Sequence, residues 1–311
     1  MAESPEILTG ASKNRAGFAM DTERRIKTIK RFIERMPSLP TSVTKVLEIC
    51  NRPDTSPNDL NRVISLDPVL TGQVMKLINS AYYALPNRIT SLTRAIIMLG
   101  INTVKNLALA TSVLSTFRDR IACRRMTMDD FWAHSLGVGV IAKTLAQITG
   151  VTAAEQETYF VAGLLHDLGK IPLANKFPGE YDQVVETVGS NGASLVECEQ
   201  KVFGVDHLHV GGMIAGKWRL NHDMQAAITG HCLECGDVSD HTVAIMVALA
   251  DYLAVRFDIG AAGNREIEDK VLIAALGRIS IRPDKLEGLR SKVEQEIERA
   301  RDFLKIAGRE D

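Results

Sequence analysis

The sequence has few of the features that mark secreted or membrane-spanning proteins. Its five cysteines are an odd number in a chain of 311 residues, and they suggest no disulfide framework of the kind that stabilises small extracellular domains. The N-terminus lacks the basic and apolar blocks of a signal peptide. Apolar runs such as Val243–Ala250 are too short to cross a bilayer. These absences lead us to expect a cytoplasmic protein without a membrane as partner.

The chain also lacks an excess of charge of either sign. The chain has 37 lysines and arginines and 38 aspartates and glutamates, so its formal net charge is -1, and no overall field favours nucleic acid or an anionic membrane. The short N-terminal helices are spaced superficially like helix-turn-helix units, but residues 84–88 and Lys105 offer only scattered basic charge. We therefore do not expect nucleic acid as a partner.

Almost every segment is predicted to be helical, and we find no convincing alternating pattern of a strand. Helix starts are marked by side chains that cap the first turn, in two cases followed by proline. These caps are Ser56, Asp67, Thr127, Thr152 and Ser194. Helix ends are predicted at three glycines, which can adopt the left-handed conformation: Gly100, Gly150 and Gly204. We predict an all-α fold of two packed helical subdomains.

The chain divides into four predicted regions. Residues 1–23 are polar and aperiodic, and we predict that they form a mobile tail. Residues 24–125 form an N-terminal helical half, which opens with an amphipathic helix. Residues 126–260 form a second helical half. Residues 261–311 form a C-terminal helical extension, in which the charged run Lys285–Arg301 is predicted to be a solvated helix face.

A histidine and an aspartate, His166 and Asp167, directly follow the apolar segment Tyr159–Leu165. Two ionisable side chains at the end of a buried helix cost free energy unless something binds them. A divalent metal would do so, because imidazole nitrogen and carboxylate oxygen together suit Zn, Fe or Mn. Taken alone, the pair would more often be a helix-end aspartate and a core histidine with satisfied hydrogen bonds.

Four further helices each direct one ionisable residue at the core, on the apolar stripe or one turn beyond it. These residues are His134, His207, His231 and Asp251. One such residue is more often a hydrogen-bonded core group, but five helices with this feature favour a common metal site. We predict that these residues and the doublet bind one or two divalent ions (Fe, Mn or Zn). Three histidines that face elsewhere or lie at helix starts or loops are not predicted ligands: His209, His222 and His241.

Two residues near these predicted ligands are candidates for further roles at the site, one as a metal ligand and one as a phosphate contact. Cys232 follows His231 and is a candidate thiolate ligand, and it shares C-x-x-C spacing with Cys235. No second pair completes a zinc ribbon, and the strand–helix context of a thioredoxin-like motif is lacking. Lys170 lies one turn beyond His166, where its ammonium could contact a phosphate held by the metals. The alternative for Lys170 is a solvent-facing lysine at a helix end, favoured by the helix dipole.

The spacing of these residues resembles a known superfamily. The order His134, His166–Asp167 and Asp251 resembles the HD metal-dependent phosphohydrolases. From about Met36 to Val255 the chain resembles the HDOD family, a bacterial signalling branch of that superfamily. The segments that carry this resemblance are LPTSVTKVLEIC, LNRVISLDPVLTGQVMKLINSAYYA, ITSLTRAIIMLGINTVKNLALA, FWAHSL, AGLLHDLGK, VFGVDHLHVGGMIAGKW and ALADYLA.

The resemblance implies an HD-type helical core in the second half and roles for its residues. By position, the doublet His166–Asp167 matches the central ligand pair of the HD superfamily. His134 matches its first histidine, and Asp251 matches its distal aspartate. Resemblance to the two-metal HD-GYP relatives adds His207 and His231 as ligands of a second ion, with Asp167 as the bridge. Those relatives commonly carry a second histidine where this chain has Cys232. The glycine-tyrosine-proline segment that names them is absent after His231, which counts against hydrolysis of cyclic di-GMP.

Two hypotheses for function follow. The first is an HDOD-type signal-transduction protein whose pocket binds a metal or small ligand and which acts through a protein partner. The second is a metal-dependent phosphohydrolase or phosphodiesterase, in which the metal lowers the pKa of water for attack on a nucleotide or another phosphoester. We favour the regulator, because many HDOD members resemble non-catalytic signalling modules, while the retained ligands keep the enzyme in consideration.

Overall fold

The computed structural model describes residues 7–117, 121–191, 193–233, 235, 240–263, 269–286 and 288–308. Every regular element within these ranges is helical, which confirms the all-α prediction. The N-terminal half contains α1 (Ile7–Arg35), α2 (Thr41–Cys50), α3 (Pro57–Ile64), α4 (Pro68–Ile78), α5 (Leu92–Leu99) and α6 (Ile101–Thr116).

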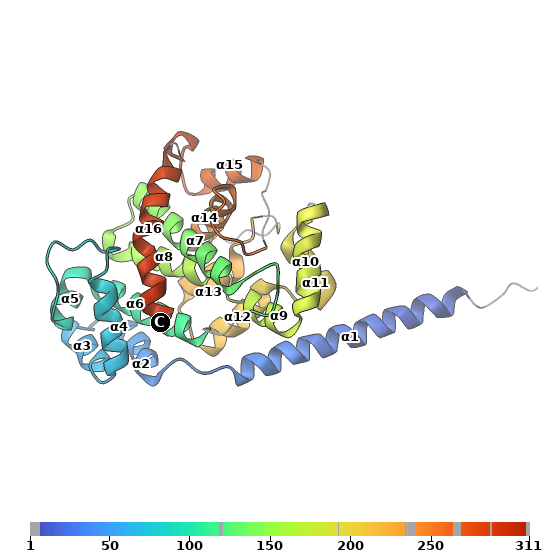
Figure 1. Cartoon of the computed structure of the whole chain (residues 1–311), viewed down its shortest axis with the longest axis horizontal. Helices are drawn as coiled ribbons and strands as arrows, with labels where there is room; N and C mark the ends of the chain where they lie inside the picture. Colours follow the sequence, from blue (N-terminus) through green and yellow to red (C-terminus); the bar gives the residue numbers. More distant parts are fainter. Residues whose placement is uncertain are drawn as a thin grey trace, which may run out of the picture.

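The rest of the chain continues the helical pattern (Figure 1). Its first helices are α7 (Met128–Ile148), α8 (Ala153–Leu165), α9 (Lys170–Lys176), α10 (Pro178–Asn191) and α11 (Leu195–Phe203). They are followed by α12 (His207–Lys217), α13 (His222–Gly230), α14 (Thr242–Arg256), α15 (Asp269–Arg278), the 3-10 helix η1 (Pro283–Leu286) and α16 (Leu289–Gly308).

The start of α1 differs from our expectation. The helix begins at Ile7, so the tail predicted for residues 1–23 is helical from that residue on, and residues 1–6 lie outside the described residues. Extending an existing helix adds one hydrogen bond for each residue ordered, which is much easier than starting a new helix. The amphipathic part supplies that start, because Ile29 and Ile33 are buried against α9, α11 and α12.

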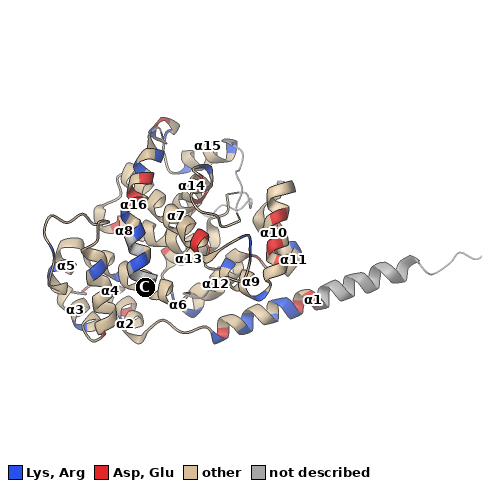
Figure 2. Cartoon of the chain, in the orientation of Figure 1, with Lys and Arg blue, Asp and Glu red and all other residues tan. Residues whose placement is uncertain are grey.

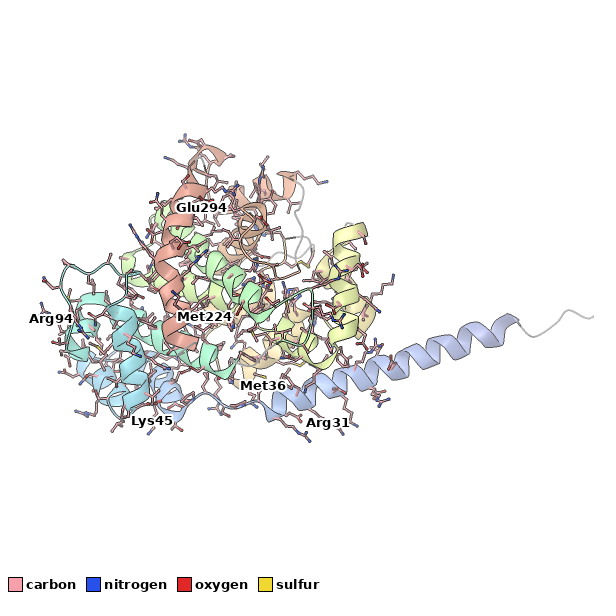
Figure 3. All side chains as sticks on the ribbon, viewed as in Figure 1. Arg31, Met36, Lys45, Arg94, Met224 and Glu294 are labelled. Carbon is pink, nitrogen blue, oxygen red and sulfur yellow. A yellow bond between two sulfur atoms is a disulfide. The ribbon has the colours of Figure 1, made fainter. Side chains whose placement is uncertain are left out.

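The C-terminal end of α1 is held by α12. The Lys217 ammonium donates hydrogen bonds to the carbonyl oxygens of Ile33, Glu34 and Met36 at 2.7, 2.8 and 2.7 Å. These acceptors lie at the end of a helix, where carbonyl groups lack helical partners. Figure 3 labels Met36 at this junction, and Figure 2 shows that the described part of α1 carries charges of both signs.

The caps predicted from the sequence are largely present. Ser56 and Ser194 each form a capping box with the acidic residue three positions later. The Asp67 carboxylate accepts a hydrogen bond from the backbone N–H of Leu70 at 3.0 Å. Thr152 differs, because its hydroxyl donates to the Glu155 carboxylate and caps no backbone group. Gly204 ends α11 with a φ of 73° in the left-handed region, as predicted.

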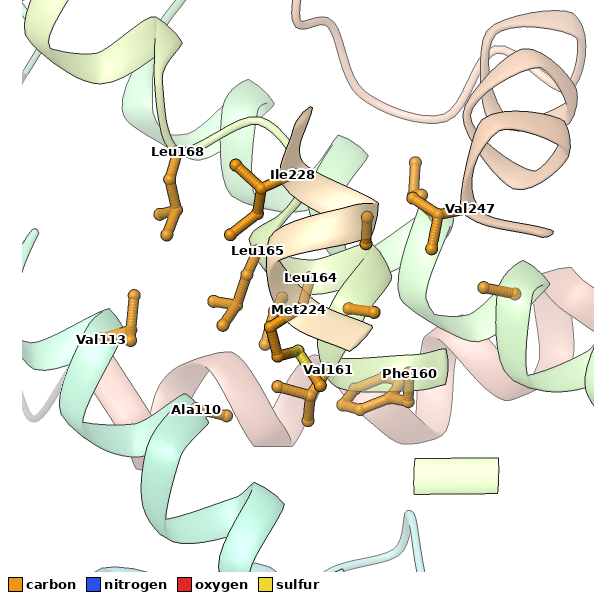
Figure 4. Close-up of a cluster of buried hydrophobic side chains, with 14 of the residues drawn as sticks. Ala110, Val113, Phe160, Val161, Leu164, Leu165, Leu168, Met224, Ile228 and Val247 are labelled. Atoms are coloured by element: carbon orange, nitrogen blue, oxygen red, sulfur yellow. The ribbon is translucent and has the colours of Figure 1, made fainter. Parts of the chain in front are cut away.

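The apolar core is continuous around α6. Every residue from Thr103 to Leu114 is buried, because α2, α4 and α5 pack on this helix together with α8 and α16. Figure 4 shows the part of the core where side chains of α6, α8, α13 and α14 meet. The labelled residues from these helices are Ala110, Val113, Phe160, Val161, Leu164, Leu165, Met224, Ile228 and Val247.

The last helix is amphipathic rather than fully solvated. α16 packs against α4, α6 and α7, and it buries Leu289, Val293 and Ala300. Its charged residues form exposed ion pairs such as Arg290–Glu294. The solvated face predicted for Lys285–Arg301 therefore coexists with an apolar face. No single helix among the described residues has the length and apolarity to cross a membrane, although the pair α5 and α6, bent by 115°, meets those criteria together.

Candidate metal centre

Five helices bring the predicted ligands to one buried point. His134 lies inside α7, Asp251 lies inside α14 and His207 is the first residue of α12. His166 and Asp167 directly follow α8, and His231 directly follows α13. All but one of these side chains are at most 5% exposed, and that of Asp251 is 17% exposed. The residues are distant in sequence and meet because α7, α8, α13 and α14 pack on one another.

The ligand atoms form two groups that share His166. In the first group, the Asp251 Oδ1 lies 2.8 Å from the His134 Nε2 and 3.7 Å from the His166 Nε2. In the second, the His166 Nε2 lies 3.1 Å from the Asp167 Oδ2, and the His231 Nε2 lies 3.4 Å from the Asp167 Oδ1. Within each group, the possible ligand atoms are all within 4.8 Å of one another. Such spacing suits a shared cation.

His207 joins the second group from α12. Its Nε2 lies 3.7 Å from the Asp167 Oδ1, and its ring centroid lies 5.4 Å from that of His231. Asp167 therefore faces His207 and His231 with Oδ1 and His166 with Oδ2.

The imidazoles are oriented through their second ring nitrogens. The Nδ1 of His166 lies 2.7 Å from the Gly163 carbonyl oxygen, and the Nδ1 of His231 lies 2.9 Å from the Ala227 carbonyl oxygen. A carbonyl accepts only from an N–H, so these contacts leave each Nε2 facing the centre. Histidines that bind metals in proteins are commonly held in this way.

Glu199 orients His207 and was missed in the sequence. Its Oε2 accepts hydrogen bonds from the Nδ1 of His207 at 2.6 Å and from the His207 backbone N–H at 2.8 Å. Its Oε1 accepts a hydrogen bond from the Tyr181 hydroxyl at 2.9 Å. A signal was present, because Glu199 lies four residues from both Leu195 and Phe203 on the buried face of α11.

Opposite charges inside the centre outweigh the effect of burial. Burial by itself lowers the pKa of His166, but the Asp167 and Asp251 carboxylates raise that pKa to about 9. Burial raises the pKa of Asp167, yet the positive charges of His166 and Lys170 hold it well below its usual range. The pKa of Asp251 is also well below its usual range, because the His134 and His166 imidazoles, whose Nε2 atoms lie 2.8 and 3.7 Å from its Oδ1, outweigh the effect of burial. Burial lowers the pKa of His231.

The buried polar atoms fit a cation. Among the described residues, the His166 Nε2 and both Asp167 carboxylate oxygens are buried and make no hydrogen bond of normal geometry. Buried polar atoms in this condition are costly, and an ion is one of the ordinary explanations for them. Two ionised carboxylates and several imidazoles supply the donor types that Zn, Fe and Mn accept. The residues present therefore fit a divalent metal.

Lys170 lies differently from our prediction. Its side chain is fully buried, and its ammonium lies 2.6 Å from the Asp167 Oδ2 and 2.9 Å from the Ala262 carbonyl oxygen. It neither faces solvent nor lines an opening through which a phosphate could approach. The structure instead makes it the internal counter-ion of Asp167.

Cys232 also departs from the prediction. Its sulfur is bonded to that of Cys235, so it offers no thiolate to a metal. The two residues lie on a turn directly after His231, and a C-x-x-C spacing is short enough to close there. Cys50, Cys123 and Cys198 are free.

A close contact between backbones places α12 beside the doublet. A Cβ on Gly169 would lie 1.8 Å from the His207 carbonyl oxygen and 2.6 Å from the Gly211 nitrogen. Only glycine allows this approach of backbone to backbone. The position of His207 at the centre therefore depends on the glycine of the HDLGK segment.

Comparison with known proteins identifies the family. A model of the HDOD domain matches residues 36–232. The chain belongs to the HDOD family. A curated relative in sequence, an uncharacterised protein of Treponema pallidum (strain Nichols), is 24% identical over 199 residues, which are 64% of this chain. The chain spans only 38% of the length of that relative.

Solved structures share the fold of this HDOD protein. An HDOD domain protein of unknown function from Geobacter sulfurreducens is 26% identical, with a TM-score of 0.68 over 89% of this chain and 98% of that one. A candidate phosphohydrolase from Shewanella amazonensis SB2B is 22% identical, with a TM-score of 0.67 over 90% and 98%. A candidate signal transduction protein from Marinobacter aquaeolei VT8 is 19% identical, with a TM-score of 0.71 over 93% and 66%.

Proposed function

We propose that this HDOD protein is a regulatory module in which a divalent cation, bound inside the second half, sets how the helices pack and how a protein partner is bound. His134, His166 and Asp251 would hold one ion. Asp167, His207 and His231 would hold a second, with His166 and Asp167 close to both. When bound, the ions supply positive charge that neutralises the buried carboxylates.

The enclosure of the ligands supports this proposal. Except for Asp251, at 17% exposure, no ligand side chain is more than 5% exposed. A catalytic metal centre needs an open position for water or substrate, whereas a structural centre is closed. Because the ligands come from five helices, a bound cation would oppose separation of those helices.

The centre is also connected to the N-terminal half. α8, which ends at the doublet, packs along α6. The Asn106 side chain on α6 donates a hydrogen bond to the Thr158 hydroxyl on α8 at 3.2 Å. On α7, the Lys143 ammonium forms an ion pair with Glu157 and donates to the Tyr82 hydroxyl at 3.0 Å. A change at the end of α8 would therefore reach α6 and the residues after α4.

Metal-dependent phosphoester hydrolysis is the second candidate, and the histidines and aspartates that the chain retains favour it. Both groups of donors are retained around His166, and the Shewanella amazonensis protein of the same fold is described as a candidate phosphohydrolase. Hydrolysis would require the core to open, because Lys170 and Asp167 are fully buried.

Metal loading followed by two measurements tests the proposal. Metal-free protein is loaded separately with Zn²⁺, Mn²⁺ and, without oxygen, Fe²⁺, and metal content is measured by elemental analysis. We expect loading to slow amide hydrogen exchange in α8 and α6, without turnover of nucleotides, cyclic nucleotides or model phosphoesters. His209→Ala is the matched control, because His209 is 69% exposed and pairs with Asp206 instead.

Two results would contradict the regulatory role. Turnover by the loaded protein that Asp167→Asn abolishes would establish the hydrolase instead. Exchange that slows only around the ligands, with α6 unaffected, would mean that metal binding does not reach the N-terminal half.

A further inference from the structure

A second group of metal-binding side chains lies outside the buried centre. His222 and Asp223 are the first two residues of α13, and His241 is the residue that precedes α14. The sequence alone does not predict either histidine as a ligand, because each lies at a likely helix start or loop. The packing of α13 on α14 brings these two starts together.

We propose that His222, Asp223 and His241 bind a zinc-class divalent ion that connects the starts of α13 and α14. One ligand atom from each residue lies within 4.8 Å of the others. The His241 Nε2 lies 3.3 Å from the Asp223 Oδ1, and the two imidazole centroids are 4.8 Å apart. Two imidazole nitrogens and a carboxylate oxygen are donors that zinc accepts with a fourth position left for water.

The backbone that carries His222 and Asp223 is held by side-chain hydrogen bonds. The Asn221 side chain caps α13 by accepting a hydrogen bond from the Met224 N–H at 3.1 Å. The Gln225 side-chain amide donates to the Leu220 carbonyl oxygen at 2.6 Å. Met224, labelled in Figure 3, is itself buried. Little conformational entropy is then lost at the start of α13 when the ion binds, since that start need not be ordered first.

The proposed site is separate from the buried centre. α13 has nine residues, so at 1.5 Å per residue its two ends are roughly 13 Å apart. His222 and Asp223 lie at one end, and His231 lies beyond the other. His222 is exposed, and the Asp223 and His241 side chains are 41% and 25% exposed. Ions can therefore enter this site without opening of the core.

Positive charge nearby limits the affinity. Burial lowers the pKa of Lys105 on α6, while the charges of Cys50 and of the Asp223 carboxylate act in the opposite direction, so the charge of this lysine acts on the carboxylate. Each helix start also carries partial positive charge, which disfavours a cation. We therefore expect weaker binding than at the buried centre, with coordinate bonds from the imidazoles as its main source.

Zinc stoichiometry tests the proposal on the full chain. Metal-free wild type, His222→Ala, His241→Ala and Asp223→Asn are dialysed against buffered free Zn²⁺ and analysed for bound metal. We expect each histidine variant to bind about one equivalent less than wild type, and Asp223→Asn to bind that equivalent more weakly. His209→Ala, another exposed histidine, should match wild type.

An Asp167→Asn protein distinguishes this site from the buried centre. Because that variant keeps the α13 and α14 starts, we expect it to retain the weaker equivalent and to shift the NMR signals of His222 and His241 on addition of Zn²⁺. Equal zinc stoichiometry in wild type, His222→Ala and His241→Ala would overturn the proposal, whatever the buried centre binds.

Discussion

Replacement of Asp167 by asparagine separates the two roles that the structure gives this carboxylate. Asparagine has nearly the same shape but carries no negative charge. In the structure, the Asp167 Oδ2 is the counter-ion of Lys170 at 2.6 Å, and both side chains are fully buried. In the metal-loaded protein, the same carboxylate would lie between the two ions.

The expected loss of stability follows from the burial of Lys170. Removing one partner of a buried ion pair leaves the other charge uncompensated, which costs about 3–5 kcal/mol. We therefore expect Asp167→Asn to lower the free energy of unfolding of the chelator-treated protein by about that amount. The double variant Asp167→Asn/Lys170→Met should recover most of the loss, because a buried ion pair can often be replaced by apolar side chains at little cost.

Metal binding should respond differently from stability. Asp167→Ala and Asp167→Asn should both lose the metal of the buried centre, and the double variant should not regain it, since the bridging carboxylate is still missing. His209→Ala should keep wild-type metal content and stability. The measurements are urea unfolding in the presence of chelator and elemental analysis after loading. Full metal content in Asp167→Asn would refute the ligand assignment, and unchanged stability would refute the role of the ion pair with Lys170.

Three further predictions concern the surroundings of the centre. Gly169→Ala should lower the free energy of unfolding by about 3 kcal/mol, since its Cβ would meet the backbone of α12. Gly179→Ala is the control and should leave that free energy unchanged, because the space around Gly179 is open. Urea unfolding of the two variants measures the difference. Asp67→Ala should cost about 1 kcal/mol at neutral pH. The pKa of Asp67 is lowered by its hydrogen bonds in the folded protein. The difference in free energy of unfolding between wild type and Asp67→Ala should therefore disappear as pH falls below about 4. A difference that does not change with pH would contradict this role of the carboxylate. Reduction before denaturation should raise the number of titratable thiols by two, from Cys232 and Cys235, and no increase would show that the disulfide is absent in solution.

Local patterns in the sequence were enough to predict the helices and most of the side chains that meet in the buried group. Capping residues such as Ser56 and Asp67 act on backbone groups within the same turn, so their effect does not depend on distant parts of the chain. Ionisable residues on apolar stripes, such as His134 and Asp251, must face the core whichever helices surround them. The division into regions at residues 23, 125 and 260 stays a prediction, apart from the helix that begins at Ile7.

Other features depended on contacts between segments. Glu199 reaches His207 only because α11 and α12 pack together. The sequence around Lys170 allows its side chain to face either solvent or the core. In the packed structure, the side chain is buried and pairs with Asp167. His222 and His241 each lie at a helix start, and neither start indicates that the other is close.

The sequence by itself determined that the chain is helical, that it resembles the HDOD family, and which histidines and aspartates belong to the buried set, because these depend on periodicity and residue order. Only the tertiary structure decided how the set is divided into two groups around His166, which residue neutralises Asp167, and which two helix starts meet at the surface. Those outcomes depend on distances between side chains far apart in sequence, and such distances are set by the packing of whole helices.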